Sequence, residues 1–290
     1  MKHRAGFVNI IGKPNVGKST LMNAVLGESL SIITPKAQTT RHRIMGLLNH
    51  PDYQIVFSDT PGLLAPSYKM QERMMNFVEQ AFSDADIIIY ITIPDEVIEE
   101  ELRERINSLG VPVLVLLNKI DTSDQEAVTS EVEKLKEWFP DSTVMPVSAL
   151  HRFNLDAVLE FIIEWLPEHP PYFDKESLSD RPMRFFMSEM IREQIFLHYQ
   201  KEIPYSAQVE IESFKESEEL IHIRAIIYVM RQSQKGIVIG HKGEKLKKVG
   251  TGARKSMEKF LGAKVFLELH VKVDENWRDE NHKLDKYGYL

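Results

Sequence analysis

The chain has 290 residues, 43% of them hydrophobic and 27% charged, which is ordinary for a soluble globular protein and, at roughly 100–200 residues per domain, favours two domains. The absence of cysteine excludes disulfides and cysteine-based zinc sites, and the lack of an apolar run long enough for a signal peptide or a membrane span predicts a cytoplasmic protein. The net charge of −7 divides unevenly: residues 1–180 carry −11 and residues 181–290 carry +4, so only the second part is expected to bind a polyanion.

The first part of the chain alternates strand and helix patterns. Continuous apolar runs such as those at 87–93 and 111–117 are typical of parallel strands covered on both faces. The alternation predicts an α/β domain with a doubly wound, mostly parallel sheet. In chain order we expect strands at 7–11, 53–57, 87–93, 111–117 and 143–147, and helices at 19–26, 70–82, 96–109, 125–139 and 155–166.

The proline-rich stretch 167–171 ends the last of these helices, because proline cannot continue a helix. We therefore place a first domain at 1–172, a linker at 173–180 and a second domain at 181–290. The second domain is predicted to be α+β, with a half-buried antiparallel sheet. Its elements are a helix at 183–199, strands at 207–214 and 220–230, a helix, a Gly-x-x-Gly turn, a helix at 244–261 and a strand at 264–273.

A phosphate-binding loop is indicated by residues 12–19, which match G-x-x-x-x-G-K-[ST] between an apolar strand and a helix. Backbone N–H groups of such a loop and the helix N-terminus point at phosphates. Lys18 is expected to reach the β- and γ-phosphates and Ser19 to ligate Mg²⁺. A glycine-rich turn that binds nothing is the other interpretation, and four fixed positions in this context disfavour it.

Two further motifs complete a guanine-nucleotide site. Asp59 and Gly62 end a strand about forty residues after Lys18, where an aspartate holds magnesium and a glycine N–H meets the γ-phosphate. Asp121, in the sequence Asn-Lys-Ile-Asp after another strand, accepts only hydrogen bonds and so pairs with the two adjacent donors of guanine, whereas adenine offers one donor and an acceptor. The predicted nucleotide contacts are Asn15, Val16, Gly17, Lys18, Ser19, Thr20, Asp59, Gly62, Asn118, Lys119, Asp121, Ser148 and Ala149.

A second site is predicted at the Gly-x-x-Gly turn of residues 240–243. Two glycines let a nucleic-acid backbone approach closely, and the stretch from Lys235 to Lys264 carries a net charge of +7. With the α-β-β-α-α-β order, this pattern resembles a type II KH domain, which binds single-stranded RNA. The expected RNA contacts are Gly240, His241, Lys242, Gly243, Lys245, Lys247 and Lys248, although a solvated helix face is the other interpretation of these lysines. Trp277 either stacks a base or, as we favour, covers the end of the sheet.

The motif order GKPNVGKS, QTTRH, DTPG, NKID and SAL, followed by the RNA module, resembles the Era family of bacterial GTPases over nearly the whole chain. The resemblance implies a monomeric GTPase, using GTP, GDP and Mg²⁺, that binds the 3′ end of small-subunit ribosomal RNA and acts in ribosome assembly. It also implies a switch segment at 31–42, in which Thr40, or alternatively Thr39, joins Ser19 and Asp59 on the metal. Lys18, Thr40 and Gly62 would then act in catalysis.

Two residues bear on the rate of hydrolysis. Leu63 stands where Ras-type GTPases carry a water-orienting glutamine, which predicts slow turnover. Asn15 is similar to the asparagine that holds K⁺ near the phosphates in related GTPases, or else it only shapes the loop. The rival functions are a GTPase peripheral to the inner face of the cell membrane, bound through the basic helix at 244–261, and a metabolic kinase, which the Asn-Lys-Ile-Asp motif disfavours.

Overall fold

The structure is a computed structural model that describes residues 3–217 and 219–289. Its residues group into two units by their contacts. The first takes in the residues up to Ser31 together with Thr40–Ala65 and Met74–Asp180, and the second takes in Ile32–Thr39, Pro66–Arg73 and the residues from Arg181 onward. Two short segments of the N-terminal sequence therefore pack with the C-terminal unit.

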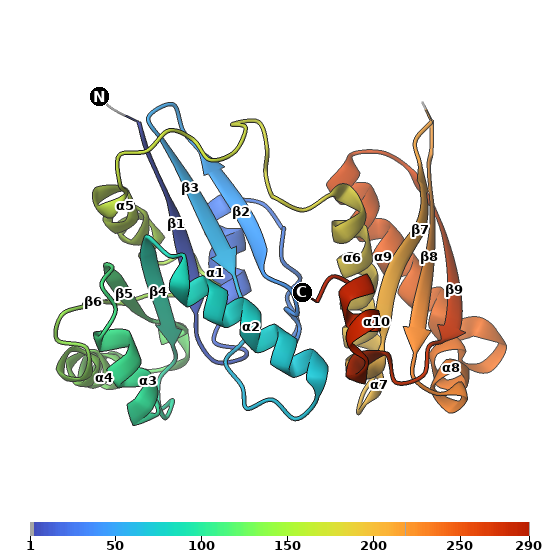
Figure 1. Cartoon of the computed structure of the whole chain (residues 1–290), viewed down its shortest axis with the longest axis horizontal. Coiled ribbons are helices and arrows are strands. Elements are labelled where there is room, and N and C mark those ends of the chain that lie inside the picture. Colours follow the sequence, from blue (N-terminus) through green and yellow to red (C-terminus); the bar gives the residue numbers. More distant parts are fainter. Residues whose placement is uncertain (1–2, 218, 290) are drawn as a thin grey trace. The chain divides into compact units, whose positions relative to one another are not determined.

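The first unit contains a six-stranded sheet in the order β2-β3-β1-β4-β5-β6 (Figure 1). Every neighbouring pair is parallel except β2 with β3, which confirms the predicted α/β fold. The strands are β1 (Arg4–Ile11), β2 (Ile44–Asn49), β3 (Tyr53–Asp59), β4 (Ile87–Thr92), β5 (Val113–Leu117) and β6 (Thr143–Pro146). The helices are α1 (Lys18–Leu26), α2 (Lys69–Ser83), α3 (Glu100–Asn107), the 3₁₀ turn η1 (Ile120–Thr122), α4 (Gln125–Trp138) and α5 (Leu155–Trp165).

Some predicted bounds were wrong, and the reasons are local. Strand β2, with the mostly apolar sequence IMGLLN, was not predicted; it forms the edge of the sheet and pairs only with β3 among the described strands. Helix α3 begins at Glu100 instead of 96, because residues 96–99 are irregular and Glu99, with a ψ of 141°, has an extended backbone. Strand β5 begins after Pro112, which lacks the N–H that a central strand needs.

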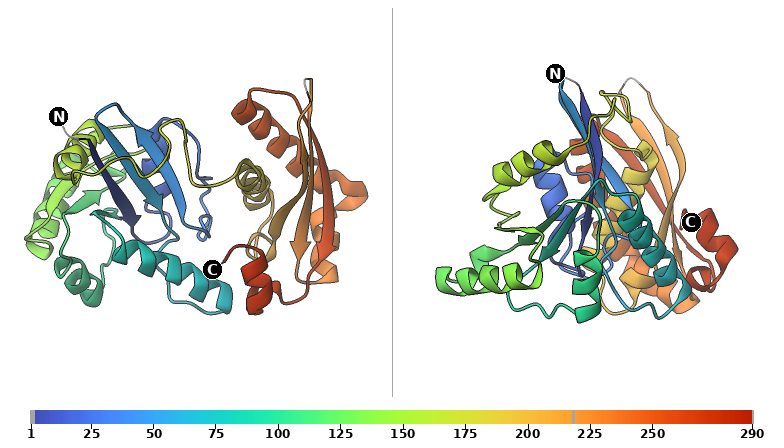
Figure 2. Two further views of the ribbon diagram at one scale, coloured as in Figure 1. Left: turned by 45° about the horizontal axis from the view of Figure 1, so that its top comes forward. Right: turned by 60° about the vertical axis from the view of Figure 1, so that its left-hand side comes forward.

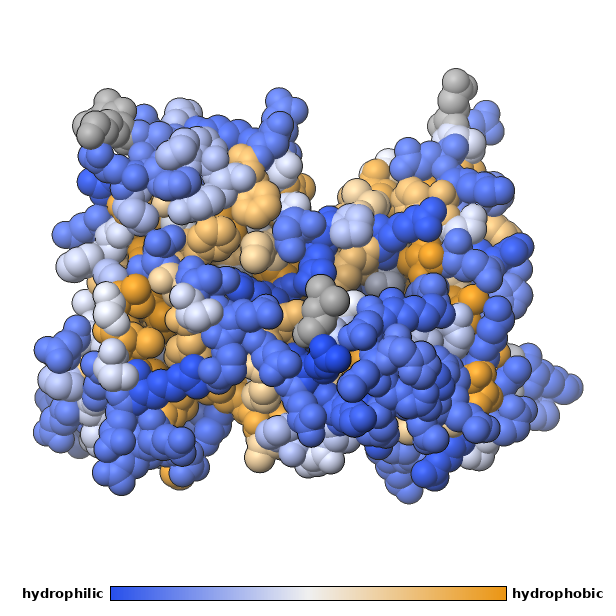
Figure 3. Space-filling model, in the orientation of Figure 1, coloured by the Kyte–Doolittle hydropathy of each residue, from blue (hydrophilic) through white to orange (hydrophobic). Residues whose placement is uncertain are grey.

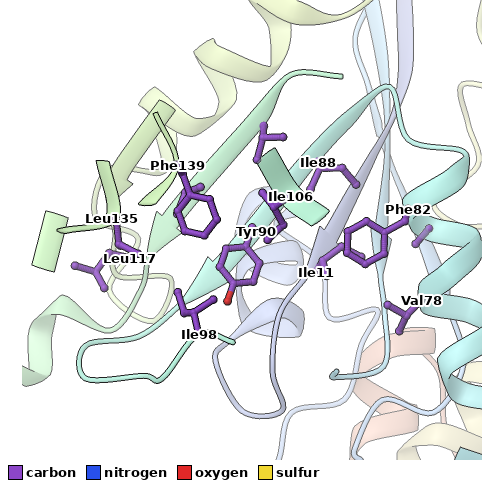
Figure 4. Close-up of a cluster of buried hydrophobic side chains, with 13 residues drawn as sticks. Ile11, Val78, Phe82, Ile88, Tyr90, Ile98, Ile106, Leu117, Leu135 and Phe139 are labelled. Carbon is purple, nitrogen blue, oxygen red and sulfur yellow. The ribbon is translucent and has the colours of Figure 1, made fainter. Parts of the chain in front are cut away.

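One face of the sheet packs against α2, α3 and α4 through a cluster of buried apolar side chains (Figure 4). Tyr90 of β4 lies near its centre, with its ring 5.7 Å from that of Phe139 after α4. Ile11 of β1 belongs to the same cluster. This packing fixes the end of β1, which leads directly into the phosphate loop.

The carboxyl ends of the parallel strands lie at one edge of the sheet. Strand β1 is flanked by β3 on one side and β4 on the other, so the strand order reverses at β1. Ligands of open α/β sheets bind at such a reversal, outside the carboxyl ends of the strands. The topology thus brings the segments after β1, β3, β5 and β6 to a single site.

The second unit contains the three-stranded sheet β7-β8-β9, whose strands run side by side in Figure 2. Strands β7 and β8 are antiparallel, but β8 and β9 are parallel, so the expectation of an antiparallel sheet was wrong for the last strand. The α8 and α9 crossover between β8 and β9 allows the parallel pairing. The elements are α6 (Met183–His198), α7 (Ile203–Ser206), β7 (Gln208–Lys215), β8 (Ile221–Val229), α8 (Gln232–Ile239), η2 (His241–Gly243), α9 (Glu244–Leu261), β9 (Val265–Val273), η3 (Trp277–Asp279) and α10 (Asn281–Lys286).

Helices α6 and α9 pack together in this unit, with the rings of Phe186 and Phe260 5.6 Å apart. Trp277 is fully buried and donates from Nε1 to the carbonyl of Ser206 at 2.9 Å. Trp277 therefore covers the end of the sheet, as the sequence favoured, and does not stack a base.

Residues 173–180, predicted as a linker, are irregular and lie along the β2–β3 edge of the first unit. Leu178 accepts a hydrogen bond from the Leu47 N–H at 3.0 Å, and the Phe173 carbonyl accepts one from Gln54 at 2.9 Å. Within the described ranges, no helix is both long and apolar enough to cross a membrane. Hydrophilic residues cover most of the face seen in Figure 3.

Candidate nucleotide and RNA sites

The phosphate loop curves around the side chain of Lys18 at the start of α1. Lys18 is buried, and its Nζ donates to the carbonyls of Gly12 at 3.1 Å and Lys13 at 2.9 Å. Burial lowers the pKa of Lys18 to about 8, an effect that the negative charges of Asp59 and Glu96 oppose. The side chain is therefore largely cationic at neutral pH and lies inside a loop whose shape suits an anion.

Gly62 lies directly against the phosphate loop. The N–H of Leu63 donates to the Gly12 carbonyl at 3.1 Å, and a Cβ placed on Gly62 would lie 2.6 Å from the backbone nitrogen of Pro14. Only glycine fits this approach without moving the loop. The Leu63 side chain packs against the apolar cluster beneath the site, so it supplies no group that could orient a water molecule.

Three oxygen-bearing side chains converge beside the loop. Asp59 accepts hydrogen bonds at Oδ2 from Ser19 Oγ at 2.6 Å and from Thr40 Oγ1 at 3.2 Å, and the two hydroxyl oxygens lie 3.0 Å apart. Asp59 is fully buried, and its Oδ1 has no hydrogen-bond partner among the described residues. Burial raises the pKa of this carboxyl, while Lys18 and the hydroxyl donors act in the opposite direction.

This set fits a magnesium ion, because Mg²⁺ prefers hard oxygen ligands and Asp59 Oδ1 is a buried acceptor without a donor. The structure also distinguishes between Thr39 and Thr40, the two candidate metal ligands between which the sequence did not decide. Thr40 lies with Ser19 and Asp59, whereas the Thr39 hydroxyl bonds with Thr34 Oγ1 at 2.6 Å and donates to the Lys36 carbonyl at 2.7 Å. The geometry favours Thr40 as the metal ligand.

The base-recognition motifs meet at the ends of β5 and β6. Asn118 is buried and donates from Nδ2 to the Val16 carbonyl at 2.7 Å, while its Oδ1 accepts from the Ala149 N–H at 2.9 Å. Asn118 therefore joins the phosphate loop to the last motif, and its amide keeps a second N–H donor and a second lone pair for a ligand. This bridging role between segments over a hundred residues apart could not be read from the sequence.

The Asp121 side chain is hydrogen-bonded to Ser148, which follows β6. Its Oδ1 accepts from Ser148 Oγ at 2.5 Å, and the side chain remains partly exposed, so Oδ2 can face a ligand. His151 Nε2 lies 3.7 Å from Asp121 Oδ2, although the sequence gave no reason to assign this histidine a role.

The remaining predicted contacts lie around the same loops. Lys119 adopts a φ of 61° between β5 and η1. Asn15 is exposed with a φ of 66°, while Thr20 lies half-buried in the first turn of α1. All of the predicted nucleotide residues are thus brought to one edge of the sheet.

The Gly-x-x-Gly turn of the second unit joins α8 to α9. Gly240 has a φ of 74°, and a Cβ placed there would lie 2.8 Å from the Lys245 side chain, so this position requires glycine. His241 and Lys242 are exposed at the turn. The space around Gly243 is open, which leaves the turn accessible to a ligand backbone.

A groove of about 360 Å³ continues from this turn between α9 and β9. It is lined by Gly243, Leu246, Lys247, Gly250, Thr251, Arg254, Leu267 and Leu269. Apolar walls with two cations suit stacked bases and a phosphate backbone. Of the predicted lysines only Lys247 lines the groove, and Lys245 lies over the Tyr199 ring, with Nζ 6.0 Å from its centre.

Three of the groove residues that the sequence missed share one signal. Leu246, Gly250 and Arg254 recur at helical spacing along one face of α9, and a Cβ placed on Gly250 would lie 3.3 Å from Leu269. Small residues on a helix face mark a close approach to a neighbour. The two leucines of β9 look like ordinary core residues in the sequence and give no such signal.

The fold and these two sites define a P-loop GTPase joined to a KH domain. The family described as 50S ribosome-binding GTPase matches residues 7–119, and the KH domain family matches residues 202–278. A structure of Era in complex with MgGDPNP and nucleotides 1506–1542 of 16S ribosomal RNA is 36% identical to this chain, with a TM-score of 0.93 and 99% of both chains covered. A variant of Era from Aquifex aeolicus bound to GDP and AlF₄⁻ gives the same values. The chain belongs to the Era family and is a GTPase.

Proposed function

We propose that this chain is a Mg²⁺-dependent GTP switch that binds the 3′ end of small-subunit ribosomal RNA and acts in assembly of the small subunit. One observation carries the proposal: a guanine-nucleotide site and an RNA-type groove lie in one chain that matches Era over 99% of its length, and that Era structure holds both MgGDPNP and 16S ribosomal RNA. The first domain is proposed to span 1–172, followed by the linker 173–180 and the RNA-binding domain 181–290.

The proposed chemistry follows from the first unit. A magnesium ion held by Ser19, Thr40 and Asp59 would neutralise charge on the β- and γ-phosphates. Lys18 would hold the same phosphates, and the Gly62 N–H would meet the γ-phosphate, since Gly62 lies against the loop. Leu63 offers no polar group to the attacking water, so intrinsic hydrolysis should be slow.

Asn15 is proposed as a ligand of K⁺ beside the phosphates. Its exposed position in the phosphate loop supports the proposal, because the side chain lies outside the packed core. An ion there would add positive charge where other GTPases use an arginine. A loop-shaping role predicts equal rates in K⁺ and Na⁺.

RNA is proposed to lie along the groove from Gly243 to Arg254, with its backbone at the Gly240–Gly243 turn. The chain is further proposed to act as a cytoplasmic monomer. The membrane alternative, with α9 on anionic lipid, is disfavoured, because Val249, Ala253 and Met257 on the apolar face of α9 are buried and cannot enter a bilayer.

The RNA proposal is tested with charge-reversal variants of the full chain. Lys242→Asp and the double variant His241→Asp with Lys242→Asp should lose affinity for a single-stranded oligonucleotide of the ribosomal RNA 3′ end, because carboxylates would face phosphate. Lys259→Asp is the matched control, since Lys259 is exposed on the same helix and does not line the groove. Equal loss in the control would mean general electrostatics and no defined site, and binding to anionic vesicles in place of RNA would support the membrane alternative.

A further inference from the structure

The open face of the three-stranded sheet in the second unit carries a row of side chains that the RNA groove does not use. Cross-strand pairing places Lys215 of β7 opposite His222 of β8, and His222 opposite Phe266 of β9. Side chains that lie directly opposite each other on neighbouring strands share one face of a sheet. All three residues are exposed, and Phe266 is 53% exposed, so the row belongs to the surface and not to the core.

This row borders a hollow of about 230 Å³ on the same face. The next row along the strands completes its lining with Arg224 and Glu268, which also lie opposite each other. Arg224 Nε donates to Glu268 Oε2 at 3.0 Å, and Glu212 lies 3.8 Å from the same guanidinium, so the charge of Arg224 is compensated by carboxylates. Lys215 supplies the other permanent positive charge of the hollow.

The other end of the same face is covered. Tyr228 lies on β8 beyond Arg224, and its ring is 5.6 Å from that of Tyr287, which follows α10. Lys286 Nζ also lies over the Tyr228 ring, 5.3 Å from its centre. By contrast, the Phe266 ring contacts the His222 ring at 5.4 Å and is otherwise turned to solvent for half of its surface. A large exposed aromatic on an edge strand invites aggregation, which favours a ligand that covers it.

Strand β9 connects this hollow to the RNA groove. Successive side chains of a strand point to opposite faces, so Leu267 lines the groove and its neighbour Phe266 lines the hollow. Strand β9 is the last in the order β7-β8-β9, and no further described strand pairs with its outer edge (Figure 1). A strand of RNA that leaves the groove around this edge therefore meets Phe266 first.

We propose that Phe266 and Lys215 form a second RNA subsite, at which an unpaired base that leaves the groove around β9 stacks on Phe266 and a phosphate of the same segment binds Lys215. Lys215 lies two strand spacings from Phe266, about 10 Å, which suits a base and a phosphate of one strand. Stacking on an aromatic ring accepts any base, so this subsite adds affinity without sequence specificity. The inference rests on the proposed RNA groove.

The test measures how the length of an RNA changes its affinity for the full chain at fixed salt. The probes are a core oligonucleotide of about four nucleotides, the number that a Gly-x-x-Gly turn holds, and the same core extended by about four uridines at its 5′ or its 3′ end. One extension should tighten binding to the wild type. Phe266→Ala should weaken that extended RNA about tenfold, the effect of one lost base stack, and should change the affinity for the core by less than about twofold.

Two further substitutions separate stacking from general effects. Phe266→Trp should keep the affinity for the extended RNA, whereas Phe266→Leu keeps an apolar side chain without a ring and should lose most of the gain. Lys215→Gln should weaken only the extended RNA and reduce its salt dependence by about one counterion. The matched control is Trp165→Ala, because Trp165 of α5 is 52% exposed and lines neither the groove nor the hollow. It should leave both affinities unchanged.

Three results would overturn the subsite. They are no gain from either extension in the wild type, wild-type affinity for the extended RNA in the folded Phe266→Ala and Phe266→Leu proteins, and an equal loss for the core and the extended RNA. Circular dichroism confirms folding, and if Phe266→Ala does not fold, Phe266→Leu carries the comparison. A wild type that does not bind the core oligonucleotide would refute the RNA groove itself, and the core alone reveals that failure.

Discussion

Asp121→Asn should convert the base specificity of the nucleotide site. The carboxylate of Asp121 is proposed to accept from guanine N1–H and from the N2 amine. The asparagine amide keeps one acceptor oxygen but carries no charge. Its NH₂ group would face one of the two guanine donors, so that hydrogen bond is lost. Ser148 Oγ can still donate to the remaining oxygen, as it now does at 2.5 Å, so the local fold should survive.

The size of the effect follows from the two bonds. Hydrogen bonds to a charged group contribute about 1.5–3 kcal/mol each, so the loss should be about 3 kcal/mol or more, which is roughly 100-fold or more in Kd for GTP. Xanthine carries a 2-carbonyl that accepts from an amide. XTP should therefore bind the variant more tightly than GTP does, and ATP should stay weak in both proteins.

Displacement of a fluorescent GDP analogue by GTP, XTP and ATP measures this change. Asp124→Asn is the control, because Asp124 caps α4 three residues further on, accepts from the Ala127 N–H at 2.9 Å, and asparagine caps a helix equally well. A folded Asp121→Asn protein that binds GTP like the wild type, or that gains no affinity for XTP, would refute the assignment of the base site.

Three further substitutions probe the phosphate side. Lys18→Ala should abolish nucleotide binding in the same displacement assay, because it removes the buried cation of the phosphate loop, and wild-type affinity would contradict its role. Gly62→Ala places a Cβ 2.6 Å from the Pro14 nitrogen and should slow hydrolysis on the order of 100-fold through misplacement of the loop, measured as phosphate release; an unchanged rate would mean that the loop tolerates the shift. Asn15→Ala should remove a rate advantage of K⁺ over Na⁺ at equal ionic strength, and the K⁺ role fails if the wild type shows no such advantage.

The sequence predicted the features that local residue order determines. The phosphate loop, the Asp59 and Asp121 motifs and the Gly240–Gly243 turn each depend on a few neighbouring residues beside a strand or a helix. The parallel sheet followed from the same alternation of elements, because topology then decides that strand ends share an edge. These features needed no information about distant contacts.

The features that escaped prediction depend on contacts between distant segments. Asn118 meets Val16 across 102 positions, and Arg192 meets Thr39 across 153. Neither contact leaves a local pattern. The direction of β9 was misjudged for the same reason, since half-buried strands alternate alike whether their neighbour is parallel or antiparallel.

The most direct test of the account is RNA affinity measured in two nucleotide states. A labelled oligonucleotide of the small-subunit ribosomal RNA 3′ end is titrated with the full chain loaded with MgGDPNP or with GDP, at fixed salt. The account predicts about tenfold tighter binding in the MgGDPNP state, a coupling of about 1.4 kcal/mol, and loss of binding in both states for the His241→Asp, Lys242→Asp double variant. Equal affinity in the two states would contradict a GTP-controlled RNA switch, and unchanged binding by the double variant would contradict the assigned RNA site.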